Sequence, residues 1–183
     1  MKQLTKEQRC AVIRCLVDGV SIRATTRITG VAKNTIQKLT REMGEACLEF
    51  QRNALRNIAS KRIQCDEIWC FCYAKDKNLP DAMKHEPGVG SIWTWTAMDA
   101  DTKLIMSWRL GQRDAENANA LMRDVAGRVT GRVQLTTDGH RPYLEAVEGA
   151  FGCNIDYAML VKMYGNDNSP DTRYSPGLCL GAD

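Results

Sequence analysis

Residues 63–69 read Ile-Gln-Cys-Asp-Glu-Ile-Trp, an alternating and mostly apolar run that is typical of a half-buried β-strand, with an aspartate at its centre. A second apolar run, Val-Gln-Leu-Thr-Thr at residues 133–137, is followed at once by Asp138. Taking a lone carboxylate out of water is costly unless a cation or hydrogen bonds compensate for it. The sequence therefore predicts that the fold brings Asp66 and Asp138 to one shared cation.

Oxygen ligands favour hard divalent cations, so we expect Mg²⁺ or Mn²⁺ at these two aspartates. A pair of carboxylates that holds such an ion is the usual machinery for cutting or joining phosphodiesters. The simpler interpretation makes Asp66 a polar residue at a strand edge and Asp138 the N-cap of a helix. Because side chains alternate along a strand, Asp66 and Glu67 are expected on opposite faces, and only a bulge would turn both into one site.

The periodicity of residues 63–161 predicts a mixed α/β sheet. Asp99 lies between the expected strands 91–98 and 103–110, and we expect it in the turn of a hairpin and not in a metal site. Residues 162–183 are rich in Gly, Pro, Asn and Asp and lack periodicity, so we expect an irregular tail there. The expected strands are 62–73, 91–98, 103–110, 132–137 and 154–161, and the expected helices are 114–129 and 141–151.

Residues 1–44 are expected to form a helix-turn-helix DNA-binding domain of three helices, with Gly30 in the turn before the third. The same pattern also fits a three-helix bundle with an ordinary solvated face. Residues 45–62 are expected to form a basic helical connector. The outward positions of the third helix suit contacts with phosphates or base edges in the major groove of DNA: Lys33, Asn34, Thr35, Gln37, Lys38 and Arg41.

The distribution of charge favours DNA binding by the N-terminal part. Residues 1–62 hold 13 Lys/Arg and 5 Asp/Glu, whereas residues 63–183 hold 12 and 17, and the net charge of the chain is +3. A basic module joined to an acidic one suits double-stranded DNA as the partner of the first and a cation as the ligand of the second.

The chain has no apolar run of about 18 residues, so no membrane span is expected. Its first residues lack the apolar segment of a signal peptide, which predicts a cytoplasmic location. The eight cysteines are then expected to be reduced thiols. A zinc-stabilised interaction module built on Cys65, Cys70, Cys72 and Cys153 is an alternative, although the usual Cys-x-x-Cys spacing is absent.

Four segments in order resemble the core of bacterial IS1-type insertion-sequence transposases. They are Cys-Asp-Glu-Ile-Trp at 65–69, Trp-Thr-Trp-Thr-Ala-Met-Asp-Ala-Asp-Thr-Lys at 93–103, Gly-Gln-Arg-Asp at 111–114 and Thr-Asp-Gly-His-Arg-Pro-Tyr at 137–143. The resemblance covers nearly the whole chain and implies an RNase H-like fold with a DDE-type reaction. In that reaction two aspartates and a glutamate bind two Mg²⁺ ions, which activate water or a 3′-hydroxyl for attack on a DNA phosphodiester. Asp66 and Asp138 match the two aspartates of the family.

The third carboxylate of the family is unmatched. It lies in a Tyr-Val-Glu-Arg-Gln-Asn-like motif on a helix beyond the fifth strand, and no such motif occurs in these 183 residues. Glu67 and His140 are interpreted as structural neighbours of the aspartates, and Arg141 and Tyr143 as candidate DNA contacts.

The resemblance implies a nucleoid-associated transposase that acts on the element's terminal inverted repeats and on target DNA, with a homo-oligomer as one option. The unmatched carboxylate leads us to expect a truncated, catalytically inactive form whose core lacks its C-terminal helix. The alternative is a non-enzymatic DNA-binding regulator or inhibitor derived from a transposase.

Overall fold

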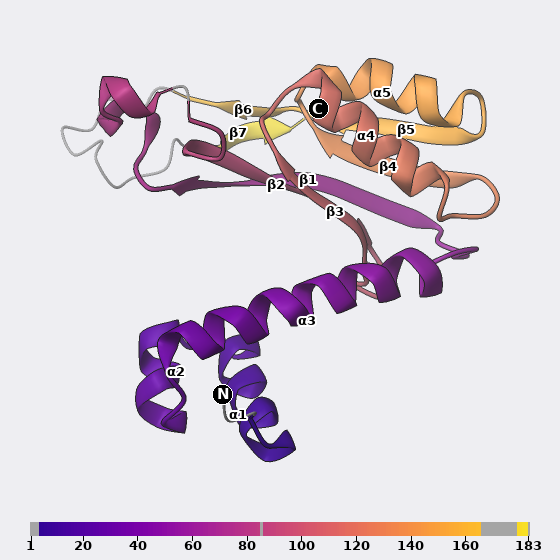
Figure 1. Cartoon of the computed structure of the whole chain (residues 1–183). Coiled ribbons are helices and arrows are strands. Elements are labelled where there is room, and N and C mark those ends of the chain that lie inside the picture. The colour runs from indigo at the N-terminus through magenta and orange to yellow at the C-terminus, as the bar shows by residue number, and fades with distance from the viewer. Residues whose placement is uncertain (1–3, 85, 166–178, 183) are drawn as a thin grey trace. The chain divides into compact units, whose positions relative to one another are not determined.

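The computed structural model describes residues 4–84, 86–165 and 179–182 (Figure 1). The chain divides into two compact units, Met1–Ala54 and Leu55–Asp183, which are described separately.

The first unit is helical, as the sequence pattern predicted. Its helices are α1 (Lys6–Val17), α2 (Ile22–Thr29) and α3 (Lys33–Ala54). A capping box at Thr5 and Gln8 starts α1, because each side chain accepts a hydrogen bond from the backbone N–H of the other residue. Gly30, with φ of 70°, ends α2 in the left-handed conformation that favours glycine. The small core of this unit consists of Val12, Val31, Ile36 and Leu39.

Helix α3 is longer than the sequence pattern predicted. The pattern ended the third helix near Met43 and placed a separate helical connector over residues 45–62, but α3 continues as one helix of 22 residues to Ala54. The second half of the expected connector is not helical, because residues 55–61 contain no helix and β1 begins at Arg62. A single glycine costs a helix only about 1 kcal/mol, and the residues after Gly44 include the good helix formers Glu, Ala, Leu, Gln and Arg. In the described part of the chain, neither α3 nor any other helix is long and apolar enough to cross a membrane.

The second unit is a mixed α/β fold around a five-stranded sheet of order β3–β2–β1–β4–β5. Strands β1, β2 and β3 pair antiparallel, whereas β4 pairs parallel with β1, and β5 parallel with β4. This arrangement agrees with the predicted mixed sheet and is consistent with an RNase H-like core. The elements are β1 (Arg62–Cys72), η1 (Asp76–Asn78), η2 (Asp81–Met83), β2 (Gly90–Asp99), β3 (Ile105–Gly111), α4 (Ala115–Ala126), β4 (Val133–Asp138), α5 (Pro142–Phe151) and β5 (Ile155–Leu160).

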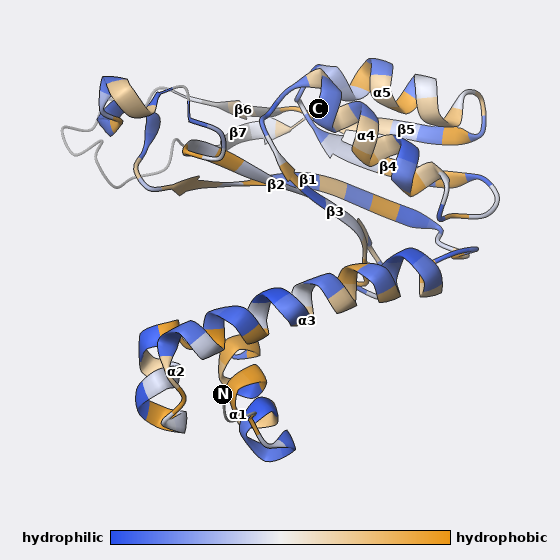
Figure 2. Ribbon diagram, in the orientation of Figure 1, coloured by the Kyte–Doolittle hydropathy of each residue, from blue (hydrophilic) through white to orange (hydrophobic). Residues whose placement is uncertain are grey.

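Helices α4 and α5 lie side by side over one face of the sheet (Figure 1). The alternation of apolar and polar residues along β1 can be followed in Figure 2, and it turns Ile63 and Cys65 toward the helices. There they join a core that includes Trp95, Leu135 and Tyr143, all fully buried. This core holds the first half of β1 rigidly, up to the residues that carry the acidic side chains.

The hairpin between β2 and β3 confirms the turn role of Asp99. The Asp99 carboxylate accepts hydrogen bonds from the backbone N–H groups of Asp101 and Thr102, and from the hydroxyls of Thr102 and Ser60. The Ser60 bond, followed by the Thr102 N–H, lowers the pKa of Asp99 to about 2.

The C-terminal segment contains regular structure that the sequence pattern did not predict. Strands β6 (Lys162–Tyr164) and β7 (Cys179–Ala182) pair antiparallel in a separate two-stranded sheet. Such pairing joins segments that are distant in sequence, so local periodicity does not reveal it. The rest of the expected irregular tail, apart from Gly165, lies outside the described residues.

Candidate metal centre

The pairing between the parallel strands β1 and β4 ends just before the two aspartates. The last paired residues are Gln64 and Thr136, and Asp66 and Asp138 each lie two positions further along their strands. Strand β4 ends at Asp138, whereas β1 continues to Cys72 in register with β2. The aspartates therefore lie at the carboxyl ends of paired parallel strands, where α/β sheets usually bind ligands.

Three carboxylates converge at this point. One oxygen atom from each of Asp66, Glu67 and Asp138 lies within 4.8 Å of the others. The Glu67 side chain is only 1% exposed, whereas the Asp138 side chain is 39% exposed. The predicted proximity of Asp66 and Asp138 is thus present in the structure, and Glu67 joins them. We name these three residues the acidic centre.

The prediction that Asp66 and Glu67 could share a site only through a bulge is wrong. Their pairing with β2 is regular, with Asp66 opposite Thr96 and Glu67 opposite Trp95. The two side chains do leave β1 on opposite faces, but beyond Gln64 this edge of β1 is no longer paired with β4. Both carboxylates can therefore turn around the free edge toward Asp138.

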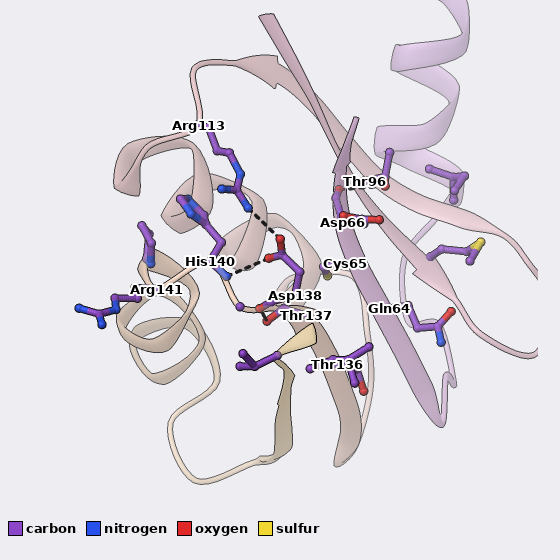
Figure 3. A pocket seen from close by; sticks show the side chains of 16 residues that line it. Gln64, Cys65, Asp66, Thr96, Arg113, Thr136, Thr137, Asp138, His140 and Arg141 are labelled. Carbon is purple, nitrogen blue, oxygen red and sulfur yellow. Dashed lines mark hydrogen bonds and ion pairs between the residues drawn. The ribbon is translucent and has the colours of Figure 1, made fainter. Parts of the chain in front are cut away.

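The simpler interpretation of Asp138 as a helix N-cap also fails. Its Oδ1 accepts the backbone N–H of His140 at 3.0 Å, but α5 begins only at Pro142, with Arg141 in the N-cap position. The other oxygen of Asp138 contacts Arg113 (Figure 3). The side chain thus points into the acidic centre and does not cap the helix.

Arg113 bridges two members of the acidic centre. Its Nε lies 2.9 Å from Oε2 of Glu67, and its Nη2 lies 2.7 Å from Oδ2 of Asp138. Its guanidinium carbon also lies 5.2 Å from the centroid of the Trp93 ring. Arg113 precedes Asp114, whose carboxylate caps α4 by accepting the N–H of Asn117, so the start of the helix fixes the position of the arginine. The sequence reasoning missed this role, although Arg113 stood in one of the four recognised segments.

Three buried polar atoms around the acidic centre have no hydrogen-bond partner among the described residues. They are Oε1 of Glu67, Nε2 of His140 and the hydroxyl of Tyr143. Burial raises the pKa of Tyr143, and the nearby Glu67 carboxylate raises it further. Burial, then the positive charge of Arg113, lowers the pKa of His140. An unpartnered carboxylate oxygen beside two other carboxylates is the donor set that a divalent cation requires, so the residues present fit a metal ion.

The acidic centre opens into a pocket of about 800 Å³. Its lining combines polar side chains, among them Gln64, Thr96 and Thr136, with apolar ones such as Met98 and Ile105. Exposed Arg141 also lines it, so this candidate DNA contact remains accessible, whereas Tyr143 is fully buried and is excluded as one. The volume falls in the range of sites that bind small molecules.

The candidate DNA-binding residues lie in the other unit, along the first turns of α3. Lys33, Asn34, Gln37, Lys38 and Arg41 are exposed as predicted, whereas Thr35 is half-buried. Lys38 pairs with Glu42 at 3.7 Å, an exposed contact that leaves its ammonium accessible.

The cysteines do not form a metal site in the described part of the chain. The acidic centre is the one group of three or more possible His, Cys or carboxylate ligands found there. Cys10, Cys15, Cys47, Cys65, Cys70, Cys72 and Cys153 are free thiols. The zinc-stabilised module therefore gains no support from these residues.

Fold and site together define a class: mixed α/β proteins with an acidic centre at the carboxyl ends of parallel strands. No protein-family model and no curated protein matches the chain. Among solved structures, the chain is similar to the cryo-EM structure of the piggyBac transposase synaptic complex with hairpin DNA. The identity is 12%, the TM-score is 0.44, and the match covers 96% of this chain and 48% of that one. This chain thus spans about half the length of that protein's chain.

Proposed function

We propose that this chain is a transposase-type protein that binds double-stranded DNA and uses a divalent metal ion, Mg²⁺ or Mn²⁺, to act on DNA phosphodiesters. The observation that carries the proposal is the convergence of Asp66, Glu67 and Asp138, whose oxygens lie within 4.8 Å of one another beside an open pocket. The resemblance of four sequence segments to insertion-sequence transposases supports the same chemistry.

The residues of the acidic centre have distinct tasks in this proposal. Asp66 and Asp138 hold the ion from two strands, and Glu67 contributes its unpartnered Oε1. When bound, the ion supplies Lewis-acid activation of the phosphodiester and of the attacking water or hydroxyl. Arg113 neutralises Glu67 and Asp138 without the ion and can contact a phosphate once the ion takes over that charge.

The acidic centre offers ligands for one metal ion. A two-metal displacement also needs ligands for a second ion, and the described residues hold no second group of three such ligands. We therefore expect weak strand cleavage by these 183 residues or none. The alternative is a DNA-binding regulator without catalysis. The observation in its favour is that Arg113 already forms ion pairs with the Glu67 and Asp138 carboxylates.

A plasmid-nicking assay distinguishes the two functions. The full chain is incubated with supercoiled DNA in Mg²⁺ and in Mn²⁺, beside variants Asp66→Asn, Asp138→Asn and Glu67→Gln. Nicking that all three substitutions abolish supports the enzyme, and binding without nicking supports the regulator. Asp81→Asn is the matched control, because Asp81 is 94% exposed and does not belong to the acidic centre.

DNA binding by the first unit is tested by charge reversal on α3. Binding to duplex DNA should weaken steeply with salt, because phosphate contacts release counterions. The double variant Lys38→Glu with Arg41→Glu should lower affinity by roughly tenfold or more and reduce the salt dependence by about one unit per lost phosphate contact. Arg14→Glu, an exposed position on α1, is the control with the same charge change per site. Unchanged affinity in the double variant would refute the role of α3.

A further inference from the structure

Beyond the acidic centre, the helix-facing side of the sheet continues as an exposed aromatic surface. Trp69 is 40% exposed and Phe71 is 46% exposed, although both follow Glu67 on the same face of β1. Their ring centroids lie 5.7 Å apart, and the planes are tilted by 39°. The ammonium of Lys75 lies 5.3 Å from the centroid of Trp69 and 6.0 Å from that of Phe71. We name Trp69, Phe71, Trp93 and Lys75 the aromatic platform.

The platform is held in position by hydrogen bonds. The indole Nε1 of Trp69 donates to the hydroxyl of Ser91 at 3.0 Å. The backbone N–H of Ser91 donates to Oδ1 of Asp76 at 2.7 Å, and the Ser91 hydroxyl donates to the other oxygen of that carboxylate. These hydrogen bonds, the side-chain bond from Ser91 first, lower the pKa of Asp76 and keep it ionised. The Trp69 ring is therefore anchored at one edge, while 40% of the residue remains exposed beside Lys75.

A chain of contacts joins the platform to the acidic centre. Trp69 pairs with Trp93 across β1 and β2, so the two indoles share a face of the sheet. The guanidinium of Arg113 lies over Trp93 and contacts Glu67 and Asp138. A strand that leaves the acidic centre over Arg113 thus meets aromatic rings and a lysine in succession.

Exposed aromatic faces interleaved with cations are the chemistry that binds unpaired nucleotides. Each base stacks on a ring, and the neighbouring ammonium or guanidinium contacts its phosphate. Bases inside a duplex have both faces covered by their neighbours, so they cannot stack on the platform. An apolar protein segment would use the rings but would offer no anionic partner to Lys75.

We propose that the aromatic platform binds unpaired nucleotides of a DNA strand whose phosphodiester lies at the acidic centre. The inference deepens the proposed function and rests on it for the identity of the strand. Stacking itself needs no metal ion, so binding can be measured independently of catalysis.

The test uses the full chain with Lys38→Glu and Arg41→Glu, which suppress binding through α3, and a fluorescein-labelled oligo-dT in EDTA. Phe71→Ala should weaken the anisotropy-derived affinity by roughly tenfold, in the range of one lost base stack. Lys75→Ala should also weaken it, through the lost contact between its ammonium and a phosphate. Ile68→Ala is the matched control, because Ile68 is 60% exposed on the opposite face of the same strand. Circular dichroism establishes that each variant is folded.

Photocrosslinking gives a second readout that loss of folding cannot imitate. Oligo-dT carrying one 5-iodouracil should crosslink to Trp69 or Phe71, as mapped by mass spectrometry. Equal affinity of the parent chain and the Phe71 and Lys75 variants, or crosslinks only outside the platform, would overturn the inference. If Mg²⁺ still stabilises the chain through Asp66 and Asp138 in that case, only the platform is refuted. If the platform binds oligo-dT but Mg²⁺ does not change the stability, only the metal-dependent function is refuted.

Discussion

Arg113 and Glu67 form an ion pair of 2.9 Å although one comes from the loop after β3 and the other from the middle of β1. The Glu67 side chain is 1% exposed, and a buried carboxylate costs several kcal/mol of desolvation unless a cation compensates for it. Arg113 thus supplies, in this arrangement, the positive charge that a bound metal ion would supply. A metal ion and Arg113 are therefore competing partners of the same carboxylate.

Replacing Arg113 is expected to make the fold dependent on metal. Arg113→Ala should lower the free energy of unfolding in EDTA by on the order of 2–3 kcal/mol, below the value for a fully buried pair because Arg113 is partly exposed. Added Mg²⁺ should restore more stability to this variant than to the wild type. Urea unfolding with and without Mg²⁺ measures both effects. Arg123→Ala, an exposed arginine on α4, should change neither. Equal Mg²⁺ responses in the wild type and Arg113→Ala would contradict the competition.

Metal should stabilise the wild type itself, because three neighbouring carboxylates repel one another. We expect millimolar Mg²⁺ or Mn²⁺ to raise the Tm by a few degrees in differential scanning fluorimetry. Asp66→Asn and Asp138→Asn should abolish the shift and leave the fold intact, whereas Asp81→Asn should retain it. A full shift in both aspartate variants would place the ion elsewhere.

The bonds to Asp99 predict a stability change in acid. Its pKa is about 2 in the folded chain, below the ordinary value of 3.8, so the folded state binds fewer protons than the unfolded state between these values. This contribution to stability is full above about pH 4 and is lost as the pH falls toward 2. Ser60→Ala should raise the pKa of Asp99 and cost about 1.5–3 kcal/mol at neutral pH. Urea unfolding from pH 2 to 7 measures this.

The double variant Ser60→Ala with Asp99→Asn is the control for that experiment. It lacks the titrating carboxylate, so the part of the acid dependence that comes from Asp99 should disappear. If the wild type and the double variant lose stability in parallel over this pH range, other carboxylates determine the acid response.

Tyr143 offers a test of the unpartnered atoms. Its hydroxyl is buried without a hydrogen-bond partner among the described residues. Tyr143→Phe removes the desolvated group and keeps the ring, so we expect stability in EDTA to be unchanged or higher by about 1 kcal/mol. Tyr143→Ala should cost about 3–5 kcal/mol through the cavity that it leaves. A loss above about 1 kcal/mol in Tyr143→Phe would show that the hydroxyl donates to Glu67.

Much of the second unit could be predicted from its periodicity. The alternating residues of β1 and the apolar run of β4 identified both strands, and the position of Asp66 and Asp138 near strand ends predicted their approach. Their role as metal ligands stays a prediction. Glu67 was misplaced because alternation describes where a side chain leaves the strand, and a long side chain at a free edge can turn back.

Arg113 could not be predicted by pattern because its role depends on where the loop after β3 returns. The same limit applies to β6 and β7, whose pairing joins distant segments. Helix α3 shows a different limit, since Gly44 is a weak helix breaker that the neighbouring residues outweigh.

The acidic centre also affects how this sequence tolerates mutation. Replacing Asp66 by asparagine relieves repulsion, so it should make the protein harder to unfold while removing a metal ligand. A library selected only for resistance to proteolysis should therefore lose Asp66, while it keeps Trp95 and the rest of the core. A library selected for binding or cutting DNA should show the opposite bias, and the difference between the two would map the residues that serve chemistry and not folding.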